Sequence, residues 1–455
     1  MPQQGKKVHF VGIGGIGMSG IAQLLHASGY HVTGSDMHAS ENTKRLEQLG
    51  ISVQIGHRAD LLPDCDLLVH TSAVGADNPE IRAALQRSIP VLKRAEMLGQ
   101  IIRHKSQRIA IAGTHGKTTT TAMVARIFSE AGFDPVVING GIDRSFHGTT
   151  KIGKGDIIIF EADEYDRSFL KMSPTDAIIT TLEADHLDCY TDLQDIERTF
   201  IQFANSLPIT GKLAICSDEP VLQKIRPAFQ RSVISYGISG EAELRAGDFR
   251  YSQAKTEFTV HQKDKPLGRI SLAVPGLHNS KNALGATSIA LAYGISFDRI
   301  ADALAQYRGV QRRFDIRKEE PQIMLVDDYA HHPTEIKATL TAARQGWSRR
   351  IIAVFQPHLY SRTRDFQREF AAALSLADIA IVTDIYPARE KPIPGVSAQL
   401  ILDAVEAEQR KSFYHSTDLA DTLEQVRKLF REGDMIITLG AGDIWKLLHQ
   451  LKESL

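Results

Sequence analysis

The chain has only three cysteines among its 455 residues, and Cys65, Cys189 and Cys216 are too scattered for a disulfide framework or a zinc-binding pattern. No apolar run reaches the ~18 residues that a membrane-spanning helix needs. The formal net charge is −1, so no overall electrostatic field attracts the chain to nucleic acid or to a membrane surface. We therefore expect a reduced cytoplasmic protein, without a signal peptide because the first residues lead directly into a strand.

The composition is that of a globular protein, with 43% hydrophobic and 24% charged residues. A length of 455 residues suggests about three domains. Strand and helix patterns alternate along the whole chain, which predicts parallel sheets covered by helices. Changes in this pattern place three α/β units at residues 1–106, 107–314 and 315–455.

Short runs of aliphatic and β-branched residues mark the expected strands. They lie at residues 7–12, 31–35, 67–70, 90–92, 109–112, 136–138, 157–160, 177–180, 213–216, 323–326, 351–355, 379–383 and 435–439. Helices are expected at residues 18–28, 119–131, 193–205 and 279–293. Between residues 232 and 274, apolar and polar residues alternate, which predicts a hairpin insertion or added antiparallel strands.

A glycine-lysine-threonine turn between an expected strand and an expected helix is the most informative stretch. It contains Gly113, Gly116, Lys117 and Thr118. This pattern is typical of a loop that holds a nucleoside triphosphate: backbone N–H groups from residue 113 to 118 surround the phosphates, the lysine neutralises them, and the threonine hydroxyl binds Mg²⁺. The usual pattern has a glycine where Ile111 stands, so this loop is a compact variant. The alternative is a helix start that is merely rich in glycine and threonine.

A second glycine-rich loop follows the first expected strand. It contains Gly12, Gly14 and Gly17, and Asp36 lies at the end of the next strand. The pattern is typical of a loop that binds a pyrophosphate at a helix N-terminus, while the acid accepts a hydrogen bond from a ligand hydroxyl. NAD and a UDP-sugar both carry these groups, so the loop by itself leaves the two ligands open. A structural turn without a ligand is a third alternative.

Acidic residues follow two further strands of the central unit. Glu161, Asp163 and Glu164 lie just after one strand, where ligands bind in open α/β sheets, and a carboxylate there suits Mg²⁺. His186 follows the next strand and is a candidate ligand of a second metal ion or of phosphate. The alternatives are a solvated acidic turn and a structural histidine. Cys189 has no evident base beside it and is expected to act as a small apolar residue.

Polar clusters mark one helix start and the third unit. Asn279 is expected either to cap its helix or to contact the nucleotide. Arg312 and Arg313 lie at the second domain junction, where they either clamp a phosphate or are solvated linker residues. Two acids and two histidines within residues 327–332 suggest zinc, but a spaced third ligand is lacking. Arg362 suits a bidentate pair with a substrate carboxylate, or else marks a charged helix start at the surface.

In this order and spacing, the motifs resemble those of the Mur ligases, the ATP-dependent amide-forming enzymes of peptidoglycan precursor synthesis. The resemblance covers nearly the whole chain. It rests on residues 12–20, 34–36, 94–98, 113–120, 161–164, 184–188, 312–315, 327–329, 331–335 and 355–358.

The resemblance implies a three-domain α/β fold: an N-terminal Rossmann-like domain for a UDP-sugar, a central P-loop ATPase-like domain with a mixed sheet for ATP, and a C-terminal Rossmann-like domain for an amino acid. It implies a ligase that joins L-alanine to the carboxylate of UDP-N-acetylmuramate through an acyl phosphate, giving ADP and phosphate. ATP and Mg²⁺ are the implied cofactors. We expect no nucleic-acid or membrane partner, and a monomer or homodimer.

The resemblance also assigns roles to individual residues. The implied UDP-sugar contacts are Gly12, Gly14, Gly15, Ile16, Gly17, Asp36, His57 and Ser72. The implied ATP contacts are Gly113, Thr114, His115, Gly116, Lys117, Thr118, Thr119, Asn279, Asn282, Arg313, Asp328 and His331. The implied metal ligands are Thr118, Glu161 and His186, and the implied amino-acid pocket is Tyr329, His358 and Arg362. The implied catalytic residues are Lys117, His186 and Arg313.

A few positions bear on the branch of the family. An alternative branch attaches a tripeptide to the same sugar nucleotide, and this chain is similar to it at Tyr165, where some alanine-adding enzymes have serine. Residues 15–18 and 356–364 are similar instead to the alanine-adding branch, although Leu359 replaces an arginine of some members. Several sister ligases carry a carbamylated lysine where Phe200 stands, so we expect no such group here.

Overall fold

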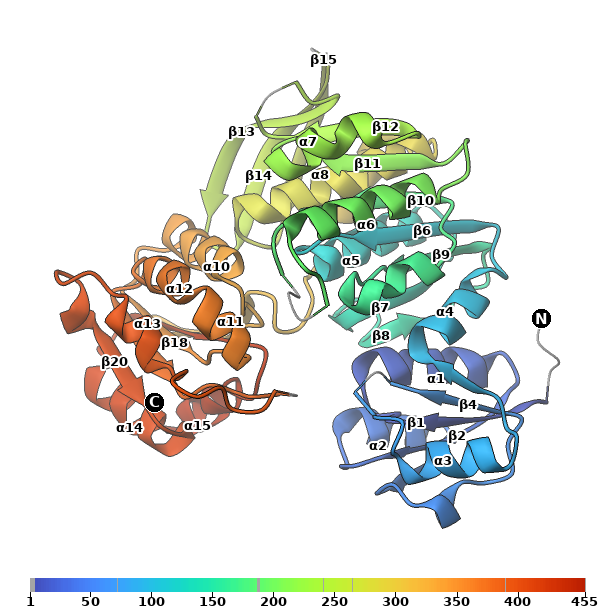
Figure 1. Ribbon diagram of the computed structural model, residues 1–455. Helices are drawn as coiled ribbons and strands as arrows, with labels where there is room; N and C mark the ends of the chain where they lie inside the picture. Colours follow the sequence, from blue (N-terminus) through green and yellow to red (C-terminus); the bar gives the residue numbers. More distant parts are fainter. Residues whose placement is uncertain are drawn as a thin grey trace. The chain divides into compact units, whose positions relative to one another are not determined.

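The computed structural model describes residues 5–71, 73–185, 189–239, 241–263, 265–388 and 390–454. Contacts divide the chain into two compact units. The first comprises Met1–Gly247, Thr259–Ile270 and Lys281–Tyr307, and the second comprises Asp248–Phe258, Ser271–Ser280 and Arg308–Leu455. Three sheets form the framework of the described residues (Figure 1), which confirms the predicted three-domain α/β class. The domain boundaries at residues 106 and 314 stay predictions.

The first sheet has five strands in the order β3-β2-β1-β4-β5, and all its neighbouring pairs are parallel. The strands are β1 (Lys7–Val11), β2 (His31–Asp36), β3 (Ser52–Ile55), β4 (Leu67–His70) and β5 (Val91–Lys93). They are connected by α1 (Ile16–Ala27), α2 (Glu41–Gln48), η1 (Ala59–Leu61) and α3 (Pro79–Gln86), and α4 (Arg94–Ile102) follows β5. The strand order reverses beside β1, which is where open α/β sheets bind ligands.

The second sheet has ten strands in the order β15-β14-β13-β12-β11-β10-β6-β9-β7-β8. Its strands are β6 (Gln107–Ala112), β7 (Val136–Asp143), β8 (Gly148–Lys151), β9 (Ile157–Glu161), β10 (Asp176–Ile179), β11 (Lys212–Cys216), β12 (Ser232–Gly237), β13 (Leu244–Ser252), β14 (Lys255–Gln262) and β15 (Lys265–Leu272). Strands β7, β9, β6, β10, β11 and β12 run parallel, and β8 is antiparallel to β7. The sheet is therefore mixed, as predicted. Two residues join the neighbouring strands β13 and β14, so the predicted hairpin is present.

Helices of this part of the chain are α5 (Lys117–Glu130), η2 (Tyr165–Lys171), α6 (Leu193–Asn205), α7 (Pro220–Ile225), η3 (Arg226–Ala228), α8 (Leu277–Ala292) and α9 (Phe297–Ala305). Strands β9 and β10 are apolar along almost their whole length and almost wholly buried. Such continuous burial is typical of parallel strands with helices on both faces. It explains why these strands were predicted from short unbroken apolar runs.

The third sheet has the order β16-β17-β21-β18-β19-β20. Its strands are β16 (Asp315–Glu319), β17 (Ile323–Asp328), β18 (Ile351–Phe355), β19 (Ile379–Thr383), β20 (Phe413–Ser416) and β21 (Asp434–Leu439), and β16 is antiparallel to β17 while the other pairs are parallel. The helices are α10 (Pro333–Gly346), α11 (Tyr360–Asp365), α12 (Gln367–Leu374), α13 (Gln399–Asp403), η4 (Arg410–Ser412), α14 (Leu419–Leu429) and α15 (Lys446–Ser454). Separate apolar clusters involve alternating residues of its central strands, as expected when both faces are covered.

Each sheet thus brings the carboxyl ends of parallel strands to one edge, and the motifs found in the sequence follow those ends. Among the described residues, no helix is both long and apolar enough to cross a membrane.

Candidate active site

The loop between β6 and α5 turns through two glycines whose φ angles are positive. Gly113 and Gly116 have φ angles of +127° and +83°, which glycine adopts at little cost. A Cβ atom on Gly113 would collide with Thr180 Oγ1 and would lie 2.9 Å from the backbone nitrogens of Thr180 and Thr181. Glycine is therefore required at this position by its conformation and by the space available.

The end of β10 holds this loop in place. The Thr114 N–H group donates to Thr181 O (3.0 Å), and the His115 N–H group donates to Thr181 Oγ1 (2.8 Å). Thr180 Oγ1 donates to Ala112 O (3.2 Å). Sequence reasoning missed the role of the two threonines, although Thr180 ends an expected strand and Thr181 directly follows it. Within the stretch predicted to surround the phosphates, the N–H groups of Thr114 and His115 therefore bond to the protein in this structure.

Lys117 is the first residue of α5, and its side chain is mostly buried, with 15% of its surface exposed. It donates to Gly113 O (2.6 Å), to Thr114 O (3.3 Å) and to both carboxylate oxygens of Glu164 (2.8 and 3.0 Å). Burial alone would lower the pKa of Lys117, but the nearby carboxylates of Glu164, Asp163 and Glu161 raise it above its ordinary value. The lysine is therefore fully charged at neutral pH.

Glu164 is only 3% exposed, although it lies in an acidic turn after β9. Its carboxylate pairs with Lys117, and its backbone oxygen accepts a hydrogen bond from Tyr190 Oη (2.6 Å). The alternative of a solvated turn is therefore wrong for Glu164. A buried carboxylate is stable here because the lysine compensates its charge.

The two described metal-ligand candidates offer the oxygen donors that Mg²⁺ prefers. Thr118 is buried in the first turn of α5, and Glu161 ends β9. Glu161 Oε1 accepts a hydrogen bond from Gly140 N–H (2.6 Å), and a Cβ atom on Gly140 would lie 2.6 Å from Glu161 Oε2. A glycine is needed for this close approach. The third candidate, His186, lies outside the described residues.

Two asparagines of α8 were predicted to contact the nucleotide. Asn282 lies against the loop between β6 and α5, because its Oδ1 is 2.5 Å from the position of a Cβ atom on Gly116. Asn279 Nδ2 donates to Pro275 O (2.7 Å). The interpretation of Asn279 as the helix cap is wrong, because α8 already begins at Leu277.

The first glycine loop leads from β1 into α1, which begins at Ile16 without a side-chain cap among the described residues. Gly14 N–H donates to Asp36 Oδ2 (2.8 Å), and a Cβ atom on Gly14 would lie 2.9 Å from that oxygen. Asn42 Nδ2 donates to Gly14 O (2.8 Å). Asp36 therefore shapes the loop. Another predicted contact, Ser72, lies outside the described residues.

Arg94 is a residue of this site that sequence reasoning did not assign to it. It begins α4, and its Nη1 is 2.9 Å from the position of a Cβ atom on Gly17. A cation beside the N-terminus of α1 adds to the attraction that this helix end exerts on an anion. The signal was available, because Arg94 follows an expected strand.

A buried charge network lies under the same loop. The Glu80 carboxylate accepts hydrogen bonds from Ser35 Oγ (2.8 Å) and is 2.8 Å from His9 Nε2 and 2.9 Å from His57 Nδ1. Burial would raise the pKa of Glu80, but these hydrogen bonds outweigh it and lower that pKa. His57 was predicted as a ligand contact. Glu80 and His9, which fix its surroundings, were missed because they are distant in sequence.

In the second unit, the ring of Tyr329 lies beside two guanidinium groups. The Cζ atoms of Arg312 and Arg313 are 5.0 and 5.2 Å from its centroid, the geometry of cation–π contacts. Arg312 Nε donates to Asp327 Oδ2 (3.1 Å), and Arg313 Nη1 lies 3.4 Å from Glu335 Oε1. The alternative of a solvated linker is therefore wrong for both arginines.

Asp328 lies at the end of β17 and is buried. Burial raises its pKa to about 6, against the opposing effects of Arg313 and of the hydrogen bonds that it accepts. These come from the N–H groups of Ala330 (2.9 Å) and Phe314 (3.0 Å) and from Thr339 Oγ1 (3.0 Å). Asp328 therefore fixes the loop that carries Tyr329.

A chain of ring contacts links several predicted residues of the second unit. Ring centroids are 5.3 Å apart for Tyr329 and His331, 5.9 Å for His331 and His358, and 5.8 Å for His358 and Tyr386. The structure therefore brings Tyr329 and His358 of the predicted amino-acid pocket together with His331. Tyr386 was missed, because nothing in its local sequence marks it.

Arg362 lies in α11 and is only 6% exposed. The alternative of a charged helix start at the surface is therefore wrong. Leu359 immediately precedes α11 and has a φ of +74°, a region that non-glycine residues rarely adopt. Such strain is often stored at functional sites.

A glycine-containing loop after β21 completes the cluster and was not predicted. Arg312 Nη2 donates to Gly440 O (2.6 Å). Asp443 N–H donates to Gln356 Oε1 (3.0 Å), and Gln356 Nε2 donates to Asp443 Oδ1 (3.0 Å). The position of this loop directly after a buried strand was the available signal.

Three family models match the chain, one for each sheet. They are the Mur ligase family catalytic domain over residues 7–106, the Mur ligase middle domain over residues 111–290, and the Mur ligase glutamate ligase domain over residues 312–442. The chain belongs to the Mur ligase family. Sequence and geometry thus agree on the family that the motifs predicted.

Individual relatives of the Mur ligase family match over nearly their full length. A UDP-N-acetylmuramate–L-alanine ligase of Syntrophotalea carbinolica is 46% identical over 448 residues, which cover 98% of each chain. The solved structure of the UDP-N-acetylmuramate–alanine ligase MurC of Thermotoga maritima is 31% identical with a TM-score of 0.85, covering 99% of this chain and 100% of that one. A murein peptide ligase of Psychrobacter arcticus is 26% identical with a TM-score of 0.74, covering 99% and 98%.

Phe200 stands where the resemblance places the carbamylated lysine of some sister ligases. It is fully buried, and its ring centroid lies 5.1 Å from that of Phe169. This position therefore belongs to the apolar core between α6 and η2.

The hydrogen bonds of Glu80 lead to a prediction about the free energy of unfolding. In Glu80→Gln, the side-chain NH₂ group faces a hydrogen-bond donor, so one hydrogen bond of the network is lost. We therefore expect the free energy of unfolding at neutral pH to fall by about 1–3 kcal/mol. Because the folded pKa of Glu80 is lowered, its stabilising contribution is lost as the pH falls through that pKa, and the difference should shrink in acid. Urea unfolding measures the free energy of unfolding of the wild type, of this variant and of the exposed control Glu424→Gln. An equal loss of unfolding free energy in both variants would contradict the account.

For Asp328 we predict the opposite dependence of protein stability on pH. Its pKa is raised from 3.8 to about 6 in the folded protein, so its contribution to stability is fully present below 3.8 and is lost as the pH rises through about 6. Relative to Asp328→Asn, the wild type should lose on the order of 1–3 kcal/mol of unfolding free energy across this range. Thermal unfolding at several pH values, with the exposed Asp302→Asn as control, measures the slope. A slope that persists in Asp328→Asn assigns it to another group.

Proposed function

We propose that the protein is an ATP-dependent ligase that joins L-alanine to the carboxylate of UDP-N-acetylmuramate. The observation that carries the proposal is the 46% identity, over nearly the whole chain, to relatives named for this reaction. Two separate glycine loops at the carboxyl ends of β1 and β6 support it, because the reaction needs one pyrophosphate site and one triphosphate site.

The reaction proceeds through an acyl phosphate. The muramoyl carboxylate attacks the γ-phosphorus of ATP, and ADP leaves. The α-amine of L-alanine then attacks the acyl carbon and loses a proton, and inorganic phosphate departs. Phosphoryl transfer of this kind depends on positioning and on charge neutralisation more than on covalent catalysis by the protein.

Lys117 supplies the fixed positive charge for this transfer. Its ammonium group is held by two backbone oxygens of the loop and by Glu164, so it is charged and in position before nucleotide binds. Groups that are already oriented stabilise developing charge without reorganisation. Asn282 contacts the same loop, and we assign it to the nucleotide site.

Mg²⁺ fits the oxygen donors of this site. Thr118 and Glu161, together with His186, are the residues that we propose to hold it. When bound, the ion neutralises phosphate charge. A hydrogen bond from Gly140 N–H keeps the Glu161 carboxylate in place.

The first loop is the proposed site of UDP-N-acetylmuramate. The uncapped N-terminus of α1 and the guanidinium group of Arg94 both attract the pyrophosphate. Asp36 and Asn42 keep the loop in its conformation. His57 borders the site through its hydrogen bond with Glu80.

In the second unit, Tyr329, His358 and Arg362 are the proposed amino-acid pocket. The first two belong to the chain of rings described above, and Arg362 provides a buried guanidinium group suited to a carboxylate. Nucleotide contacts of Arg313, Asp328 and His331, and the catalytic roles of Arg313 and His186, are part of the same proposal. We propose the cytoplasm as the location, where ATP is available and where three thiols stay reduced.

One observation favours a different acceptor. Tyr165 is similar to the branch that attaches a whole tripeptide, and a murein peptide ligase shares the fold at 26% identity. The higher identity to the alanine-adding relatives favours L-alanine.

Release of phosphate from ATP tests both acceptors. We expect release that requires UDP-N-acetylmuramate and L-alanine together, with weaker release with glycine or L-serine. Release only with L-alanyl-γ-D-glutamyl-diaminopimelate would move the chain to the tripeptide branch. No release with any of these acceptors would contradict the proposed reaction.

Lys117→Met removes the buried ammonium group but keeps an unbranched side chain. We expect kcat to fall by roughly 10²–10³-fold or more, since a preorganised charge next to the phosphates is lost. Binding of UDP-N-acetylmuramate should stay within about twofold of the wild type in calorimetric titration, because the two loops lie on different sheets. The exposed Lys428→Met serves as the control. Loss of sugar-nucleotide binding in Lys117→Met would refute the separation of the sites.

Arg362→Lys keeps the charge but removes the planar fork that binds a carboxylate through two hydrogen bonds. We expect the KM for L-alanine to rise roughly tenfold while the KM for ATP stays unchanged. The matched control is Arg364→Lys, two residues later in α11, whose guanidinium group is half exposed and pairs with Asp365. An unchanged KM for L-alanine would remove Arg362 from the pocket.

A further inference from the structure

The turn that follows β9 has an unusual backbone. Asp166 and Arg167 have φ angles of +53° and +52°, in the left-handed region that non-glycine residues rarely adopt. The same turn carries Glu164, whose carboxylate lies 2.8 Å from the ammonium nitrogen of Lys117. Strained residues persist only where other contacts hold them, and they are often found at functional sites. The contacts that hold this turn therefore bear on the position of Lys117.

Side chains of α6 hold Arg167 in place. Arg167 Nη2 donates to Asp195 Oδ2 (2.7 Å), and its Nη1 donates to Thr199 Oγ1 (3.1 Å). Asp195 Oδ2 also accepts a hydrogen bond from Thr191 N–H (3.2 Å). Asp195 and Thr199 are both buried, so the partners of the guanidinium group are themselves fixed. These contacts compensate part of the strain in the backbone of the turn.

Tyr190 contacts the same turn at two points. It is only 3% exposed, and its hydroxyl donates to the backbone oxygen of Glu164 (2.6 Å). The Cζ atom of Arg167 is 5.0 Å from the centroid of the Tyr190 ring, the geometry of a cation–π contact. Burial raises the pKa of Tyr190 above its ordinary value, so the hydroxyl keeps its proton and remains a donor.

The path from Tyr190 to Lys117 passes through one residue. Tyr190 fixes the backbone of Glu164, and both carboxylate oxygens of Glu164 accept hydrogen bonds from Lys117 (2.8 and 3.0 Å). Without the hydroxyl, the buried oxygen of Glu164 loses a hydrogen bond and the strained turn is free to relax. The carboxylate then moves with its backbone, and the ammonium group loses its fixed position.

We propose that Tyr190 is a positioning residue for phosphoryl transfer. Its hydroxyl holds Glu164, and Glu164 holds the ammonium group of Lys117 where negative charge develops on the transferred group. Tyr190 acts through these two residues and is not assigned to any ligand. The inference rests on the proposed function, because it requires Lys117 to face the phosphates of ATP.

Tyr190→Phe tests the proposal, because it keeps the ring and removes only the hydroxyl. We expect kcat for phosphate release to fall roughly tenfold, since a displaced charge stabilises the transition state less. The KM for UDP-N-acetylmuramate should stay within about twofold of the wild type, because the first glycine loop is unaffected. An unchanged kcat overturns the proposal.

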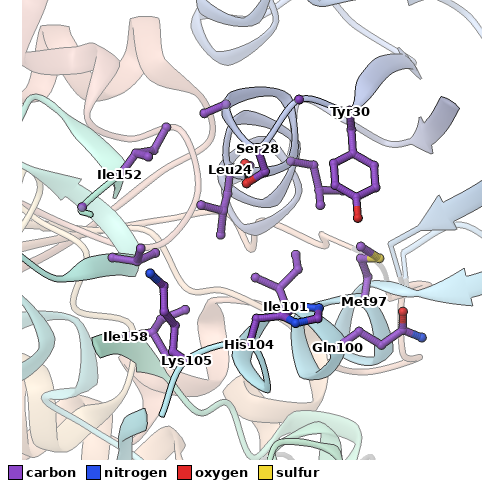
Figure 2. A pocket seen from close by; sticks show the side chains of 15 residues that line it. Leu24, Ser28, Tyr30, Met97, Gln100, Ile101, His104, Lys105, Ile152 and Ile158 are labelled. Carbon is purple, nitrogen blue, oxygen red and sulfur yellow. Dashed lines mark hydrogen bonds between the residues drawn. The ribbon is translucent and has the colours of Figure 1, made fainter. Parts of the chain in front are cut away.

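Two other tyrosines of the same unit provide matched controls. Tyr293 Oη donates to Asp176 Oδ2 (2.7 Å), so Tyr293→Phe loses a comparable hydrogen bond elsewhere. Tyr30 is buried beside a cavity of about 480 Å³, and the described residues of its wall include none from either glycine loop (Figure 2). We expect both Tyr293→Phe and Tyr30→Phe to keep the kcat of the wild type. An equal loss of kcat in Tyr293→Phe contradicts a specific role of Tyr190.

A double-mutant cycle separates positioning from a general effect on the fold. In Glu164→Ala, the Tyr190 hydroxyl has no carboxylate to position, so adding Tyr190→Phe should change kcat by less than about twofold. Single-turnover phosphate release at high enzyme concentration keeps slow variants measurable. If the double variant instead loses the product of the two separate factors, Tyr190 does not act through Glu164 and the proposal is wrong.

Acetylation of Lys117 by acetic anhydride needs no substrate, so it separates this proposal from the proposed reaction. We expect Lys117 to react roughly fivefold faster in Tyr190→Phe than in the wild type, because a loosened turn exposes its side chain more often. The exposed Lys428 is the internal reference, and peptide mass spectrometry measures both rates. An unchanged rate ratio overturns the positioning role. A wild type that releases no phosphate contradicts the proposed reaction instead.

Discussion

The buried ammonium group of Lys117 is the interaction on which the rest of the central site depends. An uncompensated charge in this position would be strongly unfavourable. Two backbone oxygens of the loop and the Glu164 carboxylate compensate it. To place them there, the chain needs positive φ angles at Gly113 and Gly116 and the close approach of β10, which glycine alone allows. The loop is therefore shaped by the protein itself, and its positive charge is already held in position.

In the other two sheets, polar and charged side chains also hold the loops after β1 and β17. In the first sheet, the loop after β1 is shaped by Asp36 and Asn42, and its positive charge comes from Arg94 and the end of α1. In the third sheet, Asp328 holds the loop after β17 through backbone N–H groups, and arginines flank Tyr329. Parallel strands bring these loops to one edge of each sheet, and carboxylates fix them.

Local patterns were enough to predict much of this. Strands β4, β18 and β19 and helix α6 have the predicted bounds, because unbroken apolar runs and a clear amphipathic period specify them. Strand β3 was missed, because it is short and none of its residues is buried. The position of both glycine loops between a strand and a helix was predicted from their glycines. The Glu80 network, Tyr386 and the loop after β21 were not, because their partners come from distant segments that only the folded chain brings together. The local sequence also did not indicate that Glu164 and Arg362 are buried, because charged residues are mostly exposed.

Hydrogen–deuterium exchange with each nucleotide added separately tests the central claim most directly, which is that the two glycine loops bind different nucleotides. UDP-N-acetylmuramate should slow exchange in the segment from Gly12 to Ser19, at the start of α1, and leave residues 113–120 unchanged. A non-hydrolysable ATP analogue with Mg²⁺ should protect residues 113–120 and leave the first loop unchanged. Protection of residues 113–120 by UDP-N-acetylmuramate, or of the first loop by the ATP analogue, would contradict the account.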